Sequence, residues 1–538
     1  MSADEDPANS VIVFHVSSSR VLVGFAGDSD CQVNLPQVIA RQLPTGVSVT
    51  VAEGETLPTS PPWYLDETEQ RLLSHATSIR EDLSLPPPEP YHINPRDPLS
   101  DITAVHRLPQ YASCSDCKWD WEAPSASVAV GHDALHTPTG VNYILRWPLG
   151  GSAGLSLAYD DVYTQSHALN DLFFIWKAAL TVLFIQGPQS QTDWSPTQPS
   201  QSLLSSYSVV LVVPDDHDAD TVSSLAALLL YSFNFSSFIV TEESVTASYA
   251  FGLGSSIVVD IGSMTTKVAA VEDGTVLTNT KLTMPFGTDN CASTLGVLLN
   301  DWSISNNLPP FNFSLSNPQH RSMLYSILYD HCHVFAPPSS SFSVCVQSLD
   351  GKEHVKRRVC LSTPQEMSTL TLPLLPLFEP LGFGMAPHAP SSPADSRDKG
   401  SELLQPFESP YLALPLGLAV VECLRRVGRS DLRRRLLGTV LLIGGGSKLK
   451  GVALALNHAI KSAVSEANLD TLVDRIEVHT ENRAGVDGDR VSWRGGAIVG
   501  CVAAVNEEIK KELFVTVEEF RHMGLRSIQS KCTFCIGS

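Results

Sequence analysis

The stretch SSIVVDIGSMTTKVAAVEDG, residues 255–274, decides the fold that this chain is predicted to adopt. It contains two short apolar runs joined by the polar turn Asp260-Ile261-Gly262-Ser263, and we interpret it as two strands and a tight turn. A carboxylate at the end of a buried strand, followed by a glycine that lets backbone approach a ligand, is typical of a turn that holds phosphate or a metal cation. The alternative is an ordinary β-hairpin in which Gly262 supplies a positive φ.

Two other stretches have related patterns. Residues 11–28, VIVFHVSSSRVLVGFAGD, again predict a strand, a small polar turn and a strand. Residues 440–451, VLLIGGGSKLKG, predict an apolar strand that runs into Gly444, Gly445 and Gly446, where a nucleotide can lie directly against backbone. Together the three stretches resemble the actin and heat-shock ATPase superfamily, in which a nucleotide lies between two such hairpins and a glycine-rich turn.

Composition places the chain among globular proteins. It has 538 residues, of which 43% are hydrophobic and 17% charged, enough for two or more domains with full cores. The net charge of -21 argues against broad binding to nucleic acid phosphates and favours a basic protein partner. The first ten residues lack the features of a signal peptide, and the most apolar stretch, residues 172–185, contains Lys177 and is short for a membrane span. We expect a soluble intracellular protein and no membrane contact.

The eleven cysteines are scattered along the chain, which suits a reducing compartment better than a disulfide framework. Two CxxC pairs, Cys114/Cys117 and Cys532/Cys535, contain enough thiols for a zinc site. No spacing rule joins pairs so far apart in the sequence, so we interpret them as ordinary thiols and predict no metal site.

The chain between the motifs alternates strands and helices. Strands at Val209–Val213 and Phe238–Val240, with a crossover helix at Ala219–Phe233 and a second helix ending near Gly252, lead into the hairpin of Asp260. This order predicts a right-handed α/β unit that delivers Asp260 to a cleft. Further helices are predicted at residues 319–335, 416–427 and 452–464 and from residue 493 onward. Residues 44–127 and 387–408 are predicted to be insertions, the second of them disordered.

Longer motifs narrow the resemblance. Four stretches look like the actin family: GFAGD at residue 24, TEESVTASYAFGLGSSIVVDIG at residue 241, IGGGSKLKG at residue 443 and WRGGAIVG at residue 493. Others look like the actin-related protein eight subfamily of INO-eighty-type chromatin remodellers: LPQVIARQ at residue 35, CSDCKW at residue 114, VGHDAL at residue 130, ILRWPLGG at residue 144 and EEFRHMGLRSI at residue 518. The resemblance implies the actin-like ATPase fold, in which two ribonuclease H-like α/β domains flank a nucleotide cleft, with subfamily insertions.

The same resemblance divides the chain into subdomains. The first subdomain is expected to comprise residues 1–36, 128–250 and 498–538, and the loop-rich second subdomain residues 37–127. The third is expected at residues 251–286 and 409–497, the fourth at 287–386, and the Pro/Ser-rich insertion at 387–408.

Several departures from actin bear on mechanism. The acidic residue that helps to hold the hydrated cation in actin's first loop is replaced by His15, and a lysine that contacts phosphate is replaced by Leu22. In the second loop, the second acidic residue and its neighbouring glycine have become Ser263 and Met264, and Met264 is expected to obstruct the approach of phosphate. The glutamine that positions the attacking water corresponds to Glu243. We find no lysine in the sequence that compensates for these losses, so turnover is expected to be slow or absent.

Nucleotide binding needs fewer groups than hydrolysis. Ser18 keeps a hydroxyl in the first turn, and the glycine turn remains able to hold an adenosine. We therefore predict ATP as a weakly or structurally bound cofactor, with no catalytic residue and no metal ligand. The predicted cofactor-binding residues are Ser18, Asp260, Gly262, Thr266, Gly444, Gly445, Gly446 and Asp330.

The resemblance implies a function as a non-catalytic scaffold in the nucleus. The expected partners are a helix of a remodeller ATPase, nuclear actin, another actin-related protein and the histones of a nucleosome, with roles in transcription regulation and DNA repair. The competing class is an active ATPase or sugar kinase of the same superfold, and a filament-forming actin is the third possibility. Residues Phe520, Met523 and Leu525 fit either core packing or a groove for a partner helix.

One basic cluster is a candidate for contact with DNA, although such a cluster is more often a solvated helix face. It comprises Arg425, Arg426, Arg429, Arg433, Arg434 and Arg435.

Overall fold

The computed structural model describes residues 7–42, 128–135, 143–150, 154–155, 163–186, 201–306, 311, 313, 318–334, 342–350, 353–361, 370–378, 414–467, 476–481 and 485–532. The predicted insertions at 44–127 and 387–408 lie outside these residues, as do Cys114, Cys117 and Cys535. The subdomain boundaries given above remain predictions.

The first sheet is organised around β1 (Val11–Val16), in which every residue is buried. Strand β1 pairs antiparallel with β2 (Arg20–Phe25) and parallel with β9 (Ser208–Val213), and β10 (Ser237–Glu242) lies parallel to β9. Two short strands complete the order β19-β10-β9-β1-β2-β3 at its edges, β3 (Val33–Pro36) and β19 (Val515–Thr516). Runs of β-branched and aliphatic residues fit such parallel strands, which are covered on both faces.

The second sheet repeats this arrangement. Strand β11 (Ser255–Ile261) pairs antiparallel with β12 (Thr266–Glu272) and parallel with β17 (Val440–Ile443), and β18 (Val478–His479) lies parallel to β17. Strand β14 (Leu282–Met284) and strand β13 (Thr275–Val276) pair antiparallel with β12. Each sheet is therefore a hairpin with two further parallel strands beside its first strand, and the two related hairpin motifs occupy equivalent positions in the two sheets.

One expectation about the topology is wrong. The sequence was interpreted as a single α/β unit that runs from β9 through β10 into the Asp260 hairpin, but that hairpin begins the second sheet. Helix α7 (Glu243–Phe251) carries the chain from one sheet to the other and ends at Gly252, which has a φ of 71°. The left-handed Gly252 ends the helix, and the strand that follows, β11, pairs with β17 in the second sheet.

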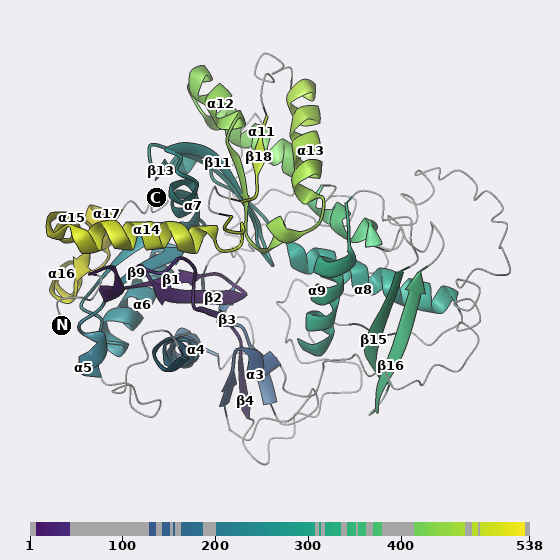
Figure 1. The fold of residues 1–538 in the computed structure, drawn as a ribbon, viewed down its shortest axis with the longest axis horizontal. Coiled ribbons are helices and arrows are strands. Elements are labelled where there is room, and N and C mark those ends of the chain that lie inside the picture. The colour runs from purple at the N-terminus through teal and green to yellow at the C-terminus, as the bar shows by residue number, and fades with distance from the viewer. Residues whose placement is uncertain are drawn as a thin grey trace, which may run out of the picture.

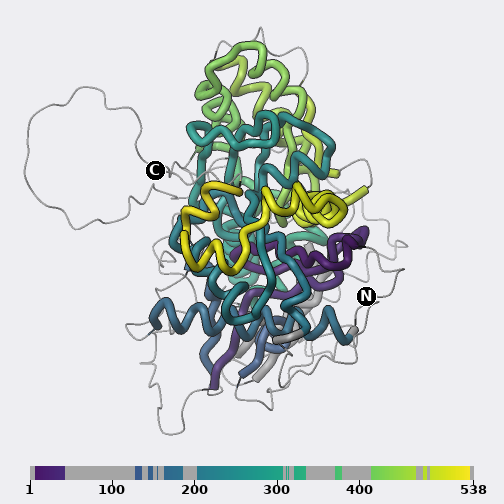
Figure 2. Tube along the Cα trace, turned by 90° about the vertical axis from the view of Figure 1, so that its left-hand side faces the viewer, coloured from purple at the N-terminus to yellow at the C-terminus, as the bar shows by residue number. Residues whose placement is uncertain are grey.

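Helix α14 (Val491–Val505) packs against α7 and the first sheet, and Figures 1 and 2 show it at about half the height of the molecule, on the left-hand side of Figure 1. A Cβ at Gly495 would lie 1.8 Å from the carbonyl oxygen of Thr246 in α7, and one at Gly496 would lie 2.7 Å from Val212. Trp493 is fully buried and its Nε1 donates to the carbonyl of Val13 at 3.3 Å. The glycines of the WRGG motif therefore let α14 touch α7 and the first sheet directly.

Helix α4 (Gln165–Gln186) packs on the first sheet and is long and apolar enough to cross a membrane by length and composition alone. Half of its most apolar segment is buried inside the protein, and Leu172, Trp176 and Leu180 belong to the hydrophobic core around the first sheet. The burial supports the expectation of a core helix. Within the described residues, it is the single helix that meets the length and composition criteria.

The remaining elements cover the two sheets and form the outer parts of Figure 1. Helices α11 (Leu416–Arg426) and α13 (Val452–Glu466) pack on each other beside the second sheet, and α8 (Thr288–Ser305) and α9 (Pro318–His331) pack together near the hairpin of β15 and β16. The other bounds are β4 (Ile39–Gln42), β5 (Val128–Val130), α3 (His132–Leu135), β6 (Tyr143–Arg146), β7 (Leu149–Gly150), β8 (Gly154–Leu155), α5 (Gln201–Leu204), α6 (Ala219–Ala227), β15 (Phe342–Asp350), β16 (Glu353–Leu361), α12 (Ser430–Leu437), α15 (Glu507–Leu513), α16 (Val517–Met523) and α17 (Leu525–Lys531).

The C-terminal side chains divide between core and surface. Phe520 is buried and its ring lies 5.8 Å from that of Phe238, whereas Met523 is 46% exposed. Leu525 packs against the core of the first half. Among the cysteines, Cys532 is a buried thiol whose sulfur accepts from the backbone N–H of Val240 at 3.4 Å.

Candidate functional site

The carboxyl ends of the parallel strands in both sheets meet at one cleft. In α/β sheets this edge is where ligands bind, because the loops that follow the strands diverge there. The turn after β1, the segment after β9, the start of α7 after β10, and the turns after β11 and β17 enclose a cavity of about 180 Å³. Its lining includes Ser17, Ser18, Ser19, Arg20, Asp216, His217, Glu243, Asp260, Gly262, Ser263, Lys267, Arg321, Tyr329, Gly444, Gly445, Gly488 and Asp489.

The first turn is held by its own backbone and by a buried glutamine. The backbone N–H of Ser17 donates to the carbonyl of Arg20 at 3.0 Å. Gln37 donates from Nε2 to the carbonyl of Ser17 at 2.5 Å, and its Oε1 accepts from the indole of Trp176 at 3.2 Å. Helix α4 therefore fixes the first turn through Gln37.

The second turn needs glycine for close contact. Gly262 does not have a positive φ, contrary to the alternative considered from the sequence. A Cβ there would lie 2.8 Å from the carbonyl oxygen of Thr265, and one at Gly287 would lie 2.6 Å from the carbonyl of Gly262. The first N–H groups of α8 complete the turn, since Thr288 and Asp289 donate to the carbonyls of Gly262 and Ser263 at 3.0 and 2.8 Å.

The third turn lies directly against the second. Gly444 has a φ of 80°, and a Cβ there would lie 2.1 Å from Oδ1 of Asp260. Asp260 and Ile443 are partners in the parallel pairing of β11 and β17, which is why the carboxylate and the glycine meet. The next residue of this turn, Gly445, lies close to the phenol group of Tyr329. A Cβ at Gly445 would lie 3.2 Å from the phenol oxygen.

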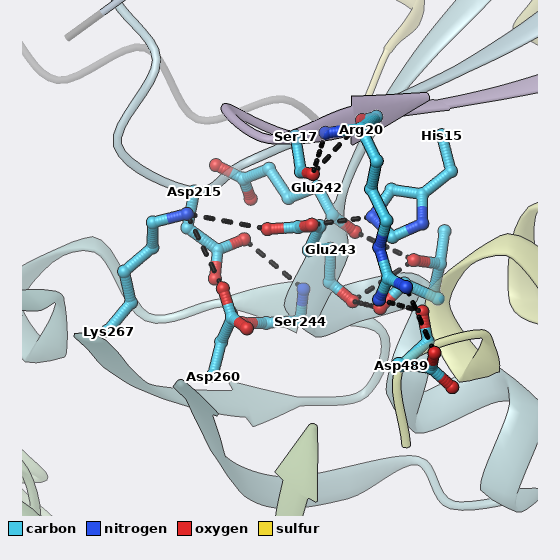
Figure 3. A network of polar contacts seen from close by, with 12 residues as sticks. His15, Ser17, Arg20, Asp215, Glu242, Glu243, Ser244, Asp260, Lys267 and Asp489 are labelled. Carbon is cyan, nitrogen blue, oxygen red and sulfur yellow. Dashed lines mark hydrogen bonds and ion pairs between the residues drawn. The ribbon is translucent and has the colours of Figure 1, made fainter. Parts of the chain in front are cut away.

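A buried lysine, Lys267, lines the cleft, and Figure 3 shows its contacts with Glu243 and Asp260. Nζ of Lys267 lies 3.4 Å from Oδ2 of Asp260, 3.5 Å from Oε2 of Glu243 and 3.3 Å from Oδ1 of Asp216. The three carboxylates together raise the pKa of Lys267 well above its usual value, despite the opposing effect of burial. The expectation that no lysine compensates for the altered cleft is wrong, because Lys267 was interpreted as part of an apolar strand.

Glu243 has partners on both oxygens. Its Oε1 lies 2.5 Å from Nε2 of His15, and its Oε2 faces Lys267. Burial favours the neutral acid, but the charge of Lys267 and the hydrogen bond from His15 outweigh it and lower the pKa of Glu243 to about 2. Glu243 is therefore a fixed anion at neutral pH.

Asp260 behaves in the opposite way. Burial and the neighbouring Glu243 raise the pKa of Asp260 to about 7, although Lys267 opposes the shift. A second cluster of buried polar residues lies nearby. In it Ser244 donates a hydrogen bond to Asp215, and Lys281 forms an ion pair with Glu242. Burial and Asp215 raise the pKa of Glu242 to about 8.

Two contacts join the halves across the cleft. The guanidinium of Arg20 in β2 donates to Oδ2 of Asp489 at 3.0 Å and to its carbonyl at 3.2 Å (Figure 3). Lys448 lies 2.6 Å from the same carboxylate, and these cations lower the pKa of Asp489 although burial raises it. The hydroxyls of Ser18 and Ser263 lie 3.2 Å apart, so the two hairpin turns touch.

The structure brings together only part of the predicted site. Ser18, Asp260, Gly262, Gly444 and Gly445 line the cavity. Their role in binding a cofactor remains a prediction.

Three predicted residues do not line the cavity. The hydroxyl of Thr266 donates to the carbonyl of Phe286 at 2.7 Å, so it points away from the cleft. Gly446 is buried against Ile261, and Asp330 accepts from Ser326 at 3.2 Å outside the lining.

Other residues were misjudged or missed. Met264 is buried and does not line the cavity, so it is not the expected obstruction to phosphate. Tyr329, the neighbour of Asp330, does line it, as do Arg20 and Lys267, which the sequence interpretation passed over.

Several buried polar atoms of the cleft have no hydrogen-bond partner among the described residues. They include both ring nitrogens of His217, Oδ2 of Asp216 and Oδ1 of Asp489. Because buried polar groups are normally satisfied, these atoms fit a polar ligand or ordered water in the cavity. A divalent cation fits less well, since no group of three or more His, Cys, Asp and Glu side chains within the described residues is arranged to hold one.

Comparison with known proteins shows which family the sequence and the fold resemble. The family profile described as Actin matches residues 175–333, which include β9, β10 and the hairpin of Asp260. Residues 175–333 are therefore similar to the actin family. The resemblance inferred from the motifs is thereby confirmed, and the similarity extends well beyond these residues.

Actin-related protein 8 of Aedes aegypti is 23% identical over 603 aligned residues, which cover 98% of this chain and 98% of the relative. Actin-related protein 9 of Arabidopsis thaliana is 25% identical over 320 residues, which cover 55% of this chain and 51% of the relative. The solved structure of human actin-related protein Arp8 in its ATP-bound state superposes with a TM-score of 0.73 at 20% identity and covers 98% of this chain and 97% of its own. The predicted actin-like fold is therefore confirmed.

Proposed function

We propose that this chain is a non-catalytic actin-fold scaffold subunit of a nuclear chromatin-remodelling complex, with ATP held in its cleft as a structural ligand. Two observations support the assignment to such a complex. The motifs resemble the actin-related protein eight subfamily at both ends and in the middle of the chain. The similarity to actin-related protein 8 of Aedes aegypti covers nearly the full length of both proteins.

The state of Glu243 carries the non-catalytic part of the proposal. Its position corresponds to the glutamine that positions the attacking water in actin. Here the carboxylate is bound by His15 and Lys267, and with a pKa of about 2 it is a poor proton acceptor at neutral pH. Both oxygens of Glu243 are already engaged within the protein, whereas phosphoryl transfer depends on a group that is available to position the attacking water and on charge stabilisation.

The cleft has the groups that a bound nucleotide needs. Backbone at Gly444 and Gly445 is free of side chains, and the hydroxyls of the first turn together with Arg20 face the cavity. The solved relative with the same fold is in an ATP-bound state, which supports ATP as the ligand. The cavity of about 180 Å³ is smaller than the roughly 300 Å³ at which ligand pockets begin, so binding of a nucleotide requires the cleft to widen.

Exposed apolar side chains support docking to a partner. Val502 and Val505 at the end of α14 are 49% and 76% exposed, and Met523 in α16 is also exposed. We propose that a helix of the remodeller ATPase covers them, with nuclear actin and another actin-related protein in the same complex. The acidic chain suits histones.

The arginine cluster is a weaker candidate for DNA, because part of it is paired within the protein. Arg429 lies 2.8 Å from Glu272, and Arg426 lies 3.1 Å from Glu422.

Affinity purification of the tagged protein from nuclear extract, with mass spectrometry, tests this proposal. We expect recovery of a remodeller ATPase, actin and a second actin-related protein, and loss of the ATPase in a Val505→Asp variant. Leu454→Asp is the matched control, because Leu454 is a similarly exposed apolar residue on α13. Recovery of none of these partners, together with ATP turnover by the pure protein, would refute the scaffold assignment and favour an enzyme.

A further inference from the structure

The carboxylates around Lys267 come from separate parts of the fold. Lys267 lies on β12 directly across from Asp260 on β11, Glu243 begins α7, and Asp216 follows β9. The ammonium group is within 3.5 Å of a carboxylate oxygen from each of them. No more than 10% of any of these four side chains is exposed, and all four line the cavity. An ammonium group has three N–H donors, and each can face a different carboxylate here.

This arrangement matches the surroundings of a bound cation. Magnesium and calcium take carboxylate oxygens as ligands at about 2.0–2.6 Å, directly or through their water shell. In this cleft the oxygens that face the cavity centre already surround Lys267. His15, which replaces the acidic residue of the family's first loop, is bound to Glu243.

A divalent cation does not fit beside this lysine. To reach Asp260 and Glu243 the ion would have to lie close to Nζ of Lys267, which is 3.4 and 3.5 Å from those carboxylates. Like charges at such a distance repel strongly in a site that excludes most water. The negative charge of Asp216, Glu243 and Asp260 is therefore already partly neutralised by Lys267, a cation that belongs to the chain itself.

We propose that the Lys267 ammonium group takes the place of the divalent cation, so that the cleft excludes Mg²⁺ and binds its nucleotide without metal. This inference rests on the proposed function for the identity of the nucleotide, but the exclusion of metal does not. Lys267 supplies a fixed charge next to the phosphate turns, and Arg20 supplies a second one at the first turn.

The first test titrates the full chain with Mn²⁺ alone and detects the bound metal by electron paramagnetic resonance. The Lys267→Met variant, which keeps the length of the side chain but removes its charge, is expected to bind one Mn²⁺ at least about tenfold more tightly than the wild type. Lys267→Arg keeps the charge and is the matched control, with affinity expected to equal that of the wild type. Tight binding of one Mn²⁺ to the wild type, with Mg²⁺ able to displace it, would overturn the proposal.

Nucleotide binding supplies the second measurement and needs no variant, so it holds even where Lys267→Met does not fold. Calorimetric titration of the wild type with ATP is expected to show tighter binding in EDTA than in excess Mg²⁺, because Mg²⁺ sequesters the metal-free ATP that this cleft binds. Binding that is equal in the two buffers, or that requires Mg²⁺, would overturn the inference while leaving the scaffold proposal intact. If ATP binds in neither buffer, the structural-ATP part of the proposed function fails, and the Mn²⁺ titration of the wild type still decides whether metal is excluded.

Discussion

Substitutions at three glycines, two in the third turn and one at the far end of α7, allow the contact between the third turn and Asp260 to be measured. Gly444→Ala introduces a Cβ 2.1 Å from Oδ1 of Asp260 and 2.6 Å from the carbonyl of Ile261, at a φ of 80°. Gly252→Ala introduces one at a φ of 71° with nothing within 4 Å. Gly445→Ala introduces one without a positive φ and 3.2 Å from Tyr329.

The expected costs follow from these surroundings. Gly252→Ala carries only the strain of a left-handed alanine, about 1 kcal/mol of unfolding free energy. Gly444→Ala carries about 1–3 kcal/mol of backbone strain. Its Cβ adds about 1–3 kcal/mol for overpacking, which gives a total of about 2–6 kcal/mol. Gly445→Ala is expected to change stability by less than about 1 kcal/mol.

Urea unfolding of the three variants under one set of conditions checks this order. The comparison of midpoints suffices, because a protein with two halves need not unfold in a single step. We expect the midpoint of Gly444→Ala to be lowest, that of Gly252→Ala intermediate and that of Gly445→Ala near the wild type. A Gly444→Ala protein as stable as Gly252→Ala would refute the close packing of the third turn against Asp260.

Three further predictions concern neighbouring contacts. The pKa of Asp260 is raised to about 7, so the protonated side chain stabilises the fold at low pH, and this stabilisation is lost as pH rises through about 7. Asp260→Asn should therefore flatten the fall of the unfolding free energy between about pH 5 and 7, measured by urea unfolding at each pH. An unchanged slope would contradict the shift. Arg20→Gln removes a partly exposed link to Asp489 worth about 1 kcal/mol, so hydrogen exchange of residues 485–490 should rise about fivefold while that of β19 stays constant. Thr266→Val leaves the carbonyl of Phe286 without its donor and should cost about 1–3 kcal/mol without changing ATP affinity; a loss of affinity at unchanged stability would restore Thr266 to the binding site.

Local patterns predicted much of the fold. The hairpins of β1–β2 and β11–β12 and the strands β9, β10 and β17 are apolar runs bounded by short polar turns, and these signals lie within a few residues of each element. The same patterns placed Asp260 and Gly444 at the carboxyl ends of strands, where the structure has them. What they could not show was which sheet each strand joins, because pairing partners such as β11 and β17 are far apart in sequence.

The errors within the site have similar causes. Successive residues of a strand point to opposite faces, so Thr266 and Lys267 cannot both face the cleft, and the structure turns Lys267 inward. A signal for Lys267 was present in the hairpin itself, since a four-residue turn sets Lys267 across from Asp260. Its contacts with Glu243 and Asp216 required the tertiary fold. The prediction of Asp330 named the correct helix, α9, but the cavity is lined by its neighbour Tyr329.

The central claim is that this cleft holds ATP without hydrolysing it. The most direct measurement incubates the purified full chain with radiolabelled ATP and follows both the bound nucleotide and the appearance of ADP over hours. The account predicts that nucleotide stays with the protein as ATP, and that Glu243→Gln, which restores the family's glutamine, does not by itself produce turnover. Rapid accumulation of ADP by the wild type, abolished in Asp260→Ala, would contradict it.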